Sequence, residues 1–210
     1  MAPDGVAFVQ DFLNTKAIAS YPDLLADTEL AQTWATSAIQ SWTRSRDIDV
    51  HPPALSAADI GKLRTLRATI ANLIAGDTAA GDGSGAVSAS LGLSDTGEVR
   101  LEPAGKGWRW LASALWGEIL LSQQTGTWRR LKQCHNPDCR STFYDRSKNN
   151  SGVWHNVKVC GNAANLRASR ARRRETQHRR GQPNRHPIAG HIAAVRRSRE
   201  PARSTGRTRM

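Results

Sequence analysis

Apolar residues recur at helical spacing in four stretches of the chain, at residues 8–14, 28–39, 60–74 and 108–124. Apolar positions three or four residues apart form a stripe on one face of a helix. Each stretch therefore predicts an amphipathic helix that buries its stripe in a common core. For the last helix we expect one apolar side and the nearby indoles to be core rather than cofactor-binding: Leu111, Leu115, Ile119, Leu120, Trp108, Trp110, Trp116 and Trp128.

Capping residues mark the ends of two of these helices. Ser56 followed by Asp59 forms a capping box, and Gly76 ends the helix that follows it. Thr28 is placed to cap the helix behind it with its hydroxyl group. The helix that ends at Gly76 is therefore the best defined element of the sequence.

A small hairpin is predicted between the third and fourth helices. Residues 76–97 are rich in Gly, Ala, Ser and Asp, which is typical of a flexible connection. Around the turn at 94–97, apolar residues alternate with other residues as in two short strands, with Leu91 and Leu93 before the turn and Val99 and Leu101 after it.

The composition is that of a globular protein, since 39% of the 210 residues are apolar. No run approaches the roughly 18 apolar residues that indicate a membrane span. The first residues lack the basic segment of a secretory signal, and three cysteines cannot all pair within one chain. We therefore expect a cytoplasmic protein that contacts no membrane.

The formal net charge of +12 is distributed unevenly. Residues 1–127 hold 9 Lys and Arg against 14 Asp and Glu, whereas residues 128–166 hold 7 against 2. Residues 167–210 hold 14 Arg against 2 Glu. Such asymmetry indicates a polyanionic partner, most simply nucleic acid, and the alternative is a solvated tail of biased composition. From about residue 176 the scarcity of apolar side chains predicts disorder, because burial cannot offset the entropy of ordering.

All three cysteines lie in one metal-ligand pattern. Four residues separate Cys134 from Cys139, and after fifteen more residues the same spacing separates His155 from Cys160. Three thiolates and one imidazole are a standard donor set of structural zinc. The sequence after Cys160 has helical character, so this thiolate is expected at a helix N-terminus, where the helix dipole favours negative charge. The alternatives are three unrelated buried thiols, or His135 in place of His155.

Further features surround these donors. Residues 130–134 read Arg-Leu-Lys-Gln-Cys, residues 143–149 follow the pattern F-x-D-x-S-x-N, and Trp154 precedes a donor residue. In these features, and in Cys160-Gly-Asn, residues 129–174 resemble the CGNR zinc finger family. Residues 1–125 resemble more loosely the ABATE domain, which precedes this finger in stress-induced transcription regulators, at Phe12-Leu-Asn14-Thr15, Trp34 and Leu63-Arg64-x-Leu66-Arg67.

The resemblance implies a DNA-binding transcription regulator whose N-terminal domain senses a signal or a partner. Three positions depart from the family pattern. His155 stands where the family has its third cysteine, Ala163 replaces the arginine of the signature, and Gly152-Val153 replaces a basic pair. Each departure removes positive charge or changes the chemistry near the metal, so a diverged member without this function is an alternative.

An arginine-rich helix is predicted directly after the last metal donor. Arg167, Arg170 and Arg174 fall at positions i, i+3 and i+7 and so share one face. Arg172 and Arg173 add charge to the same segment. A zinc module that presents such a helix can place guanidinium groups against phosphates and the base edges of a major groove. We expect these five arginines to contact nucleic acid, chiefly phosphates, and the alternative is a solvated helix.

The sequence thus predicts an α+β protein with three parts. These are a mostly helical ABATE-like domain with a small β-hairpin at 1–127, a treble-clef-like zinc finger at 128–175 and a disordered basic tail at 176–210. We expect a nucleoid-associated DNA-binding regulator that holds one structural zinc ion, responds to an unknown small-molecule or protein effector and is not an enzyme. Two other classes stay open: an RNA-binding or protein-interaction module, since Arg-rich segments bind RNA, and a metalloenzyme, for which Asp138 and Asp145 are the only nearby carboxylates.

Overall fold

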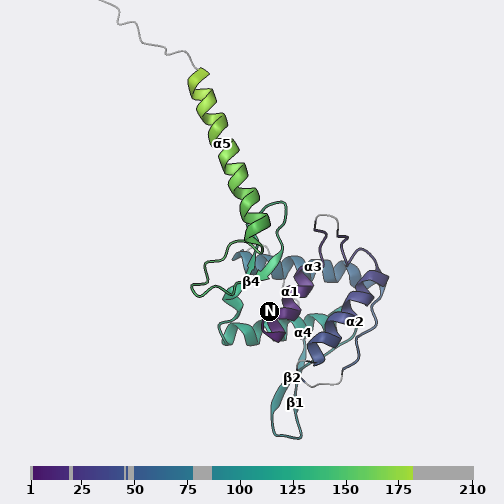
Figure 1. Cartoon of the computed structure of the whole chain (residues 1–210). Helices are drawn as coiled ribbons and strands as arrows, with labels where there is room; N and C mark the ends of the chain where they lie inside the picture. Colours follow the sequence, from purple (N-terminus) through teal and green to yellow (C-terminus); the bar gives the residue numbers. More distant parts are fainter. Residues whose placement is uncertain (1, 19–20, 45, 47–49, 78–86, 182–210) are drawn as a thin grey trace, which may run out of the picture. The chain divides into compact units, whose positions relative to one another are not determined.

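The computed structural model describes residues 2–18, 21–44, 46, 50–77 and 87–181, and these have the predicted α+β architecture (Figure 1). The helices are α1 (Asp4–Leu13), α2 (Thr28–Arg44), α3 (Ala57–Ala75), α4 (Trp108–Gln124) and α5 (Asn162–Gly181), with a 3-10 turn η1 (Trp128–Arg130) and a π-turn η2 (Val157–Gly161). The strands form two antiparallel hairpins, β1 (Ala89–Leu93) with β2 (Val99–Pro103) and β3 (Leu131–Gln133) with β4 (Thr142–Tyr144).

The chain divides into two compact units, Met1–Ser169 and Arg170–Met210. The predicted boundary between residues 127 and 128 falls inside the first unit, so the division of this region into two domains stays a prediction. No helix among the described residues is long and apolar enough to cross a membrane.

Helices α1 to α4 enclose one apolar core, as the four periodic stretches predict. Phe12 in α1 and Leu115 in α4 are fully buried, and the Phe12 ring lies 5.5 Å from the indole of Trp34 in α2. Trp42 stacks on Phe8 at 5.4 Å and meets the edge of Trp110 at 6.2 Å. Trp110 is buried. The other three indoles expected in the core are partly buried and pack against the core: Trp108, Trp116 and Trp128.

Two details of the helical prediction are wrong. Leu120 is 48% exposed, because it lies about 100° round the helix from the buried Ile119 and so leaves the core-facing side. The N-cap of α2 is Asp27 rather than Thr28, since the Asp27 carboxylate accepts a hydrogen bond from the Leu30 N–H at 2.9 Å.

The predicted ends of α3 are confirmed. Both groups of the Ser56–Asp59 capping box are present, and Gly76 ends the helix in the left-handed conformation with φ of 77°. The Asp59 carboxylate also accepts a hydrogen bond from the Trp108 N–H at 3.2 Å, so the cap ties the start of α3 to the start of α4.

The predicted hairpin is present as β1–β2, and its register places Leu91 opposite Leu101 and Leu93 opposite Val99. Its base is fixed to α4 at two points. The Ser113 hydroxyl donates to the Ser88 carbonyl at 2.7 Å and accepts from the Ala104 N–H at 3.1 Å. A Cβ at the buried Gly117 would lie 2.5 Å from Leu101 Cδ2, so the missing side chain lets Leu101 pack on the helix. Most of the flexible connection predicted before this hairpin, residues 78–86, lies outside the described residues.

The second hairpin packs on the helical body. The Asn14 side-chain amide, just after α1, donates to the Thr142 carbonyl at 2.9 Å and accepts from the Thr142 N–H at 2.8 Å. Leu131 in β3 is part of the helical core. Asn14 is one of the residues in which the N-terminal region resembles the ABATE domain, and its role here is structural. Arg67 is a second such residue, and it binds the Asp23 carboxylate with two hydrogen bonds of 2.7 Å.

Helix α5 extends to Gly181, beyond the point near residue 176 where disorder was predicted. The rest of the predicted disordered tail, residues 182–210, lies outside the described residues.

Candidate metal centre

The β3–β4 hairpin presents the first pair of predicted metal donors in the turn between its strands. Cys134 directly follows β3, and its N–H donates to the Ser141 carbonyl at 2.8 Å. The turn closes through the Cys139 N–H, which donates to the Asn136 carbonyl at 2.9 Å, and Arg140 then takes a positive φ of 50°. This tight turn brings the two sulfurs to the same side of the knuckle.

The second pair of donors precedes α5. Asn156 caps the π-turn η2 with its side chain, which accepts from the Val159 N–H at 3.2 Å. This turn carries Cys160, which is 1% exposed, to the start of α5, where the helical character of the sequence predicted it. His155 lies on the loop just before the turn and is exposed.

The four predicted donors meet in one place. The donor atoms of Cys134, Cys139, His155 and Cys160 all lie within 4.8 Å of one another. His155 Nδ1 is 3.3 Å from Cys139 Sγ and 3.4 Å from Cys160 Sγ. A sulfur and a nitrogen bound to one tetrahedral zinc ion are separated by about 3.5 Å, so this donor set fits such an ion.

The competing histidine has a different neighbour. The His135 ring meets the indole of Trp154 edge-on, with ring centroids 6.0 Å apart. His135 is not part of the donor cluster, which favours His155 as the fourth ligand. The ligand assignment itself stays a prediction.

The protein shifts the pKa values of the Cys160 and Cys139 thiols in opposite directions. Burial raises the pKa of the Cys160 thiol above its ordinary value. Burial acts in the same direction on Cys139, but hydrogen bonds from Ser141 lower its pKa overall. Since metal ligation requires thiolates, a bound cation would displace the proton from Cys160 and stabilise the buried sulfur as its thiolate.

An outer layer of polar side chains holds the donors, and the sequence analysis missed most of it. The Asn136 side chain is buried and donates to Cys160 Sγ at 3.4 Å, while the Ser141 hydroxyl lies 3.0 Å from Cys139 Sγ. Asn136 also accepts a hydrogen bond from Arg167 of α5, which pairs with Asp138 as well. The signal available in the sequence was the place of Asn136 inside the knuckle, where a short amide can bond to the turn backbone.

Arg167 is therefore engaged within the finger, although the sequence predicts that it contacts nucleic acid. Its guanidinium group joins the first turns of α5 to the knuckle through Asp138 and Asn136. The other predicted arginines are fully described and exposed, and we call them the α5 arginines: Arg170, Arg172, Arg173 and Arg174. Among the described residues, no carboxylate lies within ion-pair distance of them.

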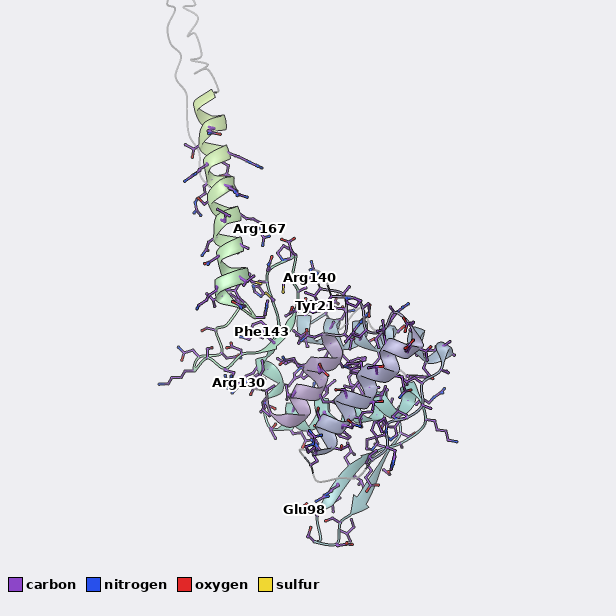
Figure 2. All side chains as sticks on the ribbon, turned by 45° about the vertical axis from the view of Figure 1, so that its right-hand side comes forward. Tyr21, Glu98, Arg130, Arg140, Phe143 and Arg167 are labelled. Atoms are coloured by element: carbon purple, nitrogen blue, oxygen red, sulfur yellow. The ribbon has the colours of Figure 1, made fainter. Side chains whose placement is uncertain are left out.

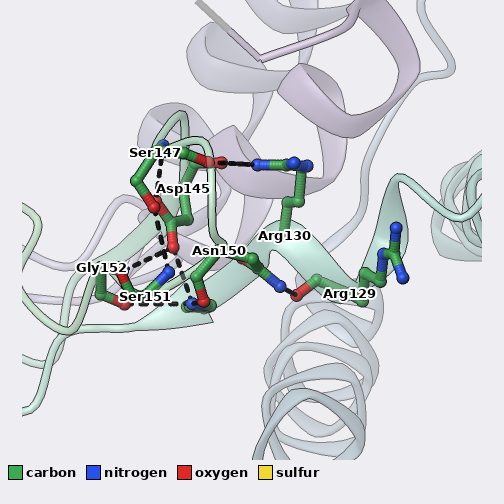
Figure 3. A network of polar contacts seen from close by, with 8 residues as sticks. Arg129, Arg130, Asp145, Ser147, Asn150, Ser151 and Gly152 are labelled. Atoms are coloured by element: carbon green, nitrogen blue, oxygen red, sulfur yellow. Dashed lines mark hydrogen bonds and ion pairs between the residues drawn. The ribbon is translucent and has the colours of Figure 1, made fainter.

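A buried carboxylate organises the loop that leads to the second donor pair (Figure 3). Asp145 is 3% exposed and accepts hydrogen bonds from Lys132 at 2.7 Å and from the N–H groups of Ser147 and Gly152 at 2.9 and 2.7 Å. Burial opposes its ionisation, but these bonds hold the pKa of Asp145 well below its usual range. The carboxylate therefore stabilises the finger above about pH 4, and less as the pH falls further.

Two further groups complete this loop. The Arg130 guanidinium donates to the carbonyls of Asp145 and Ser147 at 3.0 and 2.9 Å, as Figure 3 shows. At Gly152 a Cβ would lie 2.8 Å from Asp145 Oδ1, so the missing side chain gives its N–H access to the carboxylate. The F-x-D-x-S segment and the departure at Gly152 thus serve the same network.

Replacing Asp145 with asparagine should destabilise the zinc-loaded finger by about 2 kcal/mol at neutral pH, because Lys132 would keep a partly buried charge without its counter-ion. Hydrogen exchange of the amides at 145–152 measures the effect. The control is Asp138→Asn, since Asp138 is an exposed carboxylate of the same finger. It should cost less than about 1 kcal/mol. Equal effects of the two variants would contradict the role assigned to Asp145.

A knuckle with two cysteines, a short hairpin and a helix that begins beside the last donor define a treble-clef-like zinc finger. The comparison with protein families agrees, since residues 130–173 match the model of the CGNR zinc finger. The predicted resemblance of this region is thereby confirmed, and zinc is the metal of this class of finger. No curated protein matches the chain significantly. The similarity of residues 1–125 to the ABATE domain stays a prediction.

Proposed function

We propose that the protein is a DNA-binding transcription regulator in which the zinc finger fixes the start of a DNA-contacting helix. The observation that carries the proposal is the set of α5 arginines, which are exposed and lack carboxylate partners among the described residues. An unpaired guanidinium group is weakly hydrated and matches a phosphate with two parallel hydrogen bonds. The finger supports such a role because Cys160 and Arg167 attach α5 to the metal centre and the knuckle.

The charge distribution supports a long electrostatic contact. Residues 167–210 carry 14 Arg and 2 Glu, whereas residues 1–127 carry more acidic than basic residues. Binding of many phosphates by one segment releases counter-ions and gives most of the affinity for DNA. In this proposal the acidic helical body stays off the DNA and serves as the sensing or partner domain of a stress-responsive regulator in the nucleoid.

We further propose that the zinc is structural and that the protein is not an enzyme. Four side-chain donors would occupy every position of a tetrahedral ion and leave none for a substrate. The carboxylates closest in sequence also have partners, since Asp145 binds Lys132 and Asp138 binds Arg167. Neither of them is therefore placed as a general base.

The proposal is tested by competition between nucleic acids at physiological salt. Fluorescence anisotropy of a labelled mixed-sequence duplex DNA should show binding, and unlabelled duplex should displace it more readily than structured RNA of the same length. The logarithm of the affinity should fall with the logarithm of salt concentration, with a slope of about −0.9 for each phosphate neutralised. Displacement by the RNA at lower concentration would overturn the proposal in favour of an RNA-binding module.

A further inference from the structure

A cleft of about 750 Å³ opens between the β1–β2 hairpin and the helical body. This volume lies within the range of small-molecule sites, roughly 300–1,000 Å³. On the body side its walls include Trp42 of α2 and Trp110 and Leu121 of α4. On the hairpin side they include Leu93, Val99 and Leu101.

The hairpin forms this cleft because, among the described residues, its hydrogen bonds to the helices lie at its base. Ser113 and Leu101 fix the base to α4, as described above. Towards the tip the strands stand clear of the helices, and Figure 2 shows Glu98 at this far end. Leu93 and Val99 are consequently 74% and 69% exposed. Paired residues of an antiparallel hairpin share a face, so Leu93 and Val99 lie on the same face as Leu91 and Leu101. Of these four, Leu93, Val99 and Leu101 form an apolar strip along the cleft, whereas Leu91 does not line it.

The charged groups around the cleft are balanced. Arg46 binds the buried Glu118 at 2.6 Å, and Glu118 also accepts a hydrogen bond from the Trp42 indole at 2.9 Å. Arg100 pairs with Glu98 at 2.8 Å. Glu102, whose carboxylate lies across Gly92, also lines the cleft. The cleft is therefore lined by apolar and aromatic side chains together with two positive and two negative ones, Arg46, Arg100, Glu98 and Glu102, which leave no net charge to offer a ligand.

We infer that this cleft binds an uncharged and mainly apolar small molecule. Such a molecule would meet the small exposed parts of the two indoles rather than stack on them, since Trp42 lies between Phe8 and the Arg46 guanidinium and the exposed fractions of Trp42 and Trp110 are 5% and 9%. It would also cover Leu93 and Val99, which water now contacts. The inference names a ligand class for the sensing role and in that respect rests on the proposed function. Helix α4, which lines the cleft, is followed directly by η1 and β3 of the finger.

The probe for this site is N-phenyl-1-naphthylamine, an uncharged aromatic dye that fluoresces in apolar surroundings. The full chain, without DNA, should bind it saturably at one site, with energy transfer from tryptophan. The double variant Leu93→Ser/Val99→Ser should weaken binding by about tenfold or more, because two apolar contacts are lost. The matched control is Leu91→Ser, since Leu91 is 73% exposed on the same hairpin but does not line the cleft. It should leave the affinity unchanged.

Three outcomes would overturn the inference. The first is the absence of saturable binding, or an equal loss in Leu91→Ser. The second is tighter binding of an anionic or a cationic dye of similar size. The third is a dimer in light scattering that Leu93→Ser/Val99→Ser abolishes, which would show that a second copy covers the strip. Because no DNA is present, failure here is distinguishable from failure of the proposed function.

Discussion

Replacing Cys160 with serine should unfold residues 130–165 and leave helices α1 to α4 folded. The finger has little other core, since Val153, Val157 and Val159 are exposed. Metal binding is then coupled to folding and contributes on the order of 10 kcal/mol at neutral pH. Zinc content by elemental analysis, limited proteolysis within 135–160 and far-ultraviolet circular dichroism measure the two parts separately. Chelation of the metal should have the same effect as the substitution.

The histidine series decides which imidazole is the fourth ligand. His155→Ala should weaken zinc binding strongly, because its Nδ1 faces two of the sulfurs at 3.3 and 3.4 Å. His155→Cys should bind zinc at least as well, with one more negative charge. His135→Ala is the matched control and should barely matter, since its ring packs on Trp154. Loss of zinc in His135→Ala but not in His155→Ala would show that the ligand assignment is wrong.

The donor set could be predicted from sequence because metal chemistry restricts it to few residue types. The chain has only three cysteines, and two pairs of donors with equal spacing are difficult to explain otherwise. The hydrophobic periodicity likewise predicted the core helices and the place of the first hairpin, because these depend on local spacing. The capping box at Ser56 and Asp59 has the same local origin.

The supporting contacts could not be predicted, because they join residues far apart in sequence. Arg167 reaches Asn136 across 31 positions, and Asn14 reaches Thr142 across 128. In both cases the polar side chain bonds to a residue that is distant in the sequence, whereas from the sequence alone it would be expected to bond to solvent or to a ligand. Arg167 therefore has a structural role, and its spacing in the sequence did not distinguish this role from contact with nucleic acid.

The cleft is a second feature without a sequence signal. Its indoles belong to core helices, and both Trp42 and Trp110 are mostly buried. The cleft exists because the hairpin stands beside these indoles, and the position of the hairpin depends on Ser113 and on the missing side chain at Gly117. Neither residue changes the hydrophobic periodicity of α4, so the pattern predicted core and not a binding site.

Replacing all four α5 arginines with glutamine should lower the affinity for duplex DNA on the order of 10³-fold at physiological salt, if each binds one phosphate. The slope of log affinity against log salt should flatten by about 3 to 4. Glutamine is a good helix former and keeps α5 intact. Anisotropy titrations over a range of salt concentrations measure both quantities.

The control for this variant removes the same charge from the helical body. Four exposed basic residues there can be replaced by glutamine together: Arg44, Lys62, Lys106 and Arg109. If position rather than net charge governs binding, the slope should stay that of the unmodified protein. Arg167→Gln tests the structural role of Arg167, which joins α5 to the knuckle. This variant should speed hydrogen exchange of the knuckle amides and change the salt slope by less than one unit. Equal slopes for the α5 variant and the body variant would mean that the α5 arginines are a solvated face, and DNA contact by this helix would have to be abandoned.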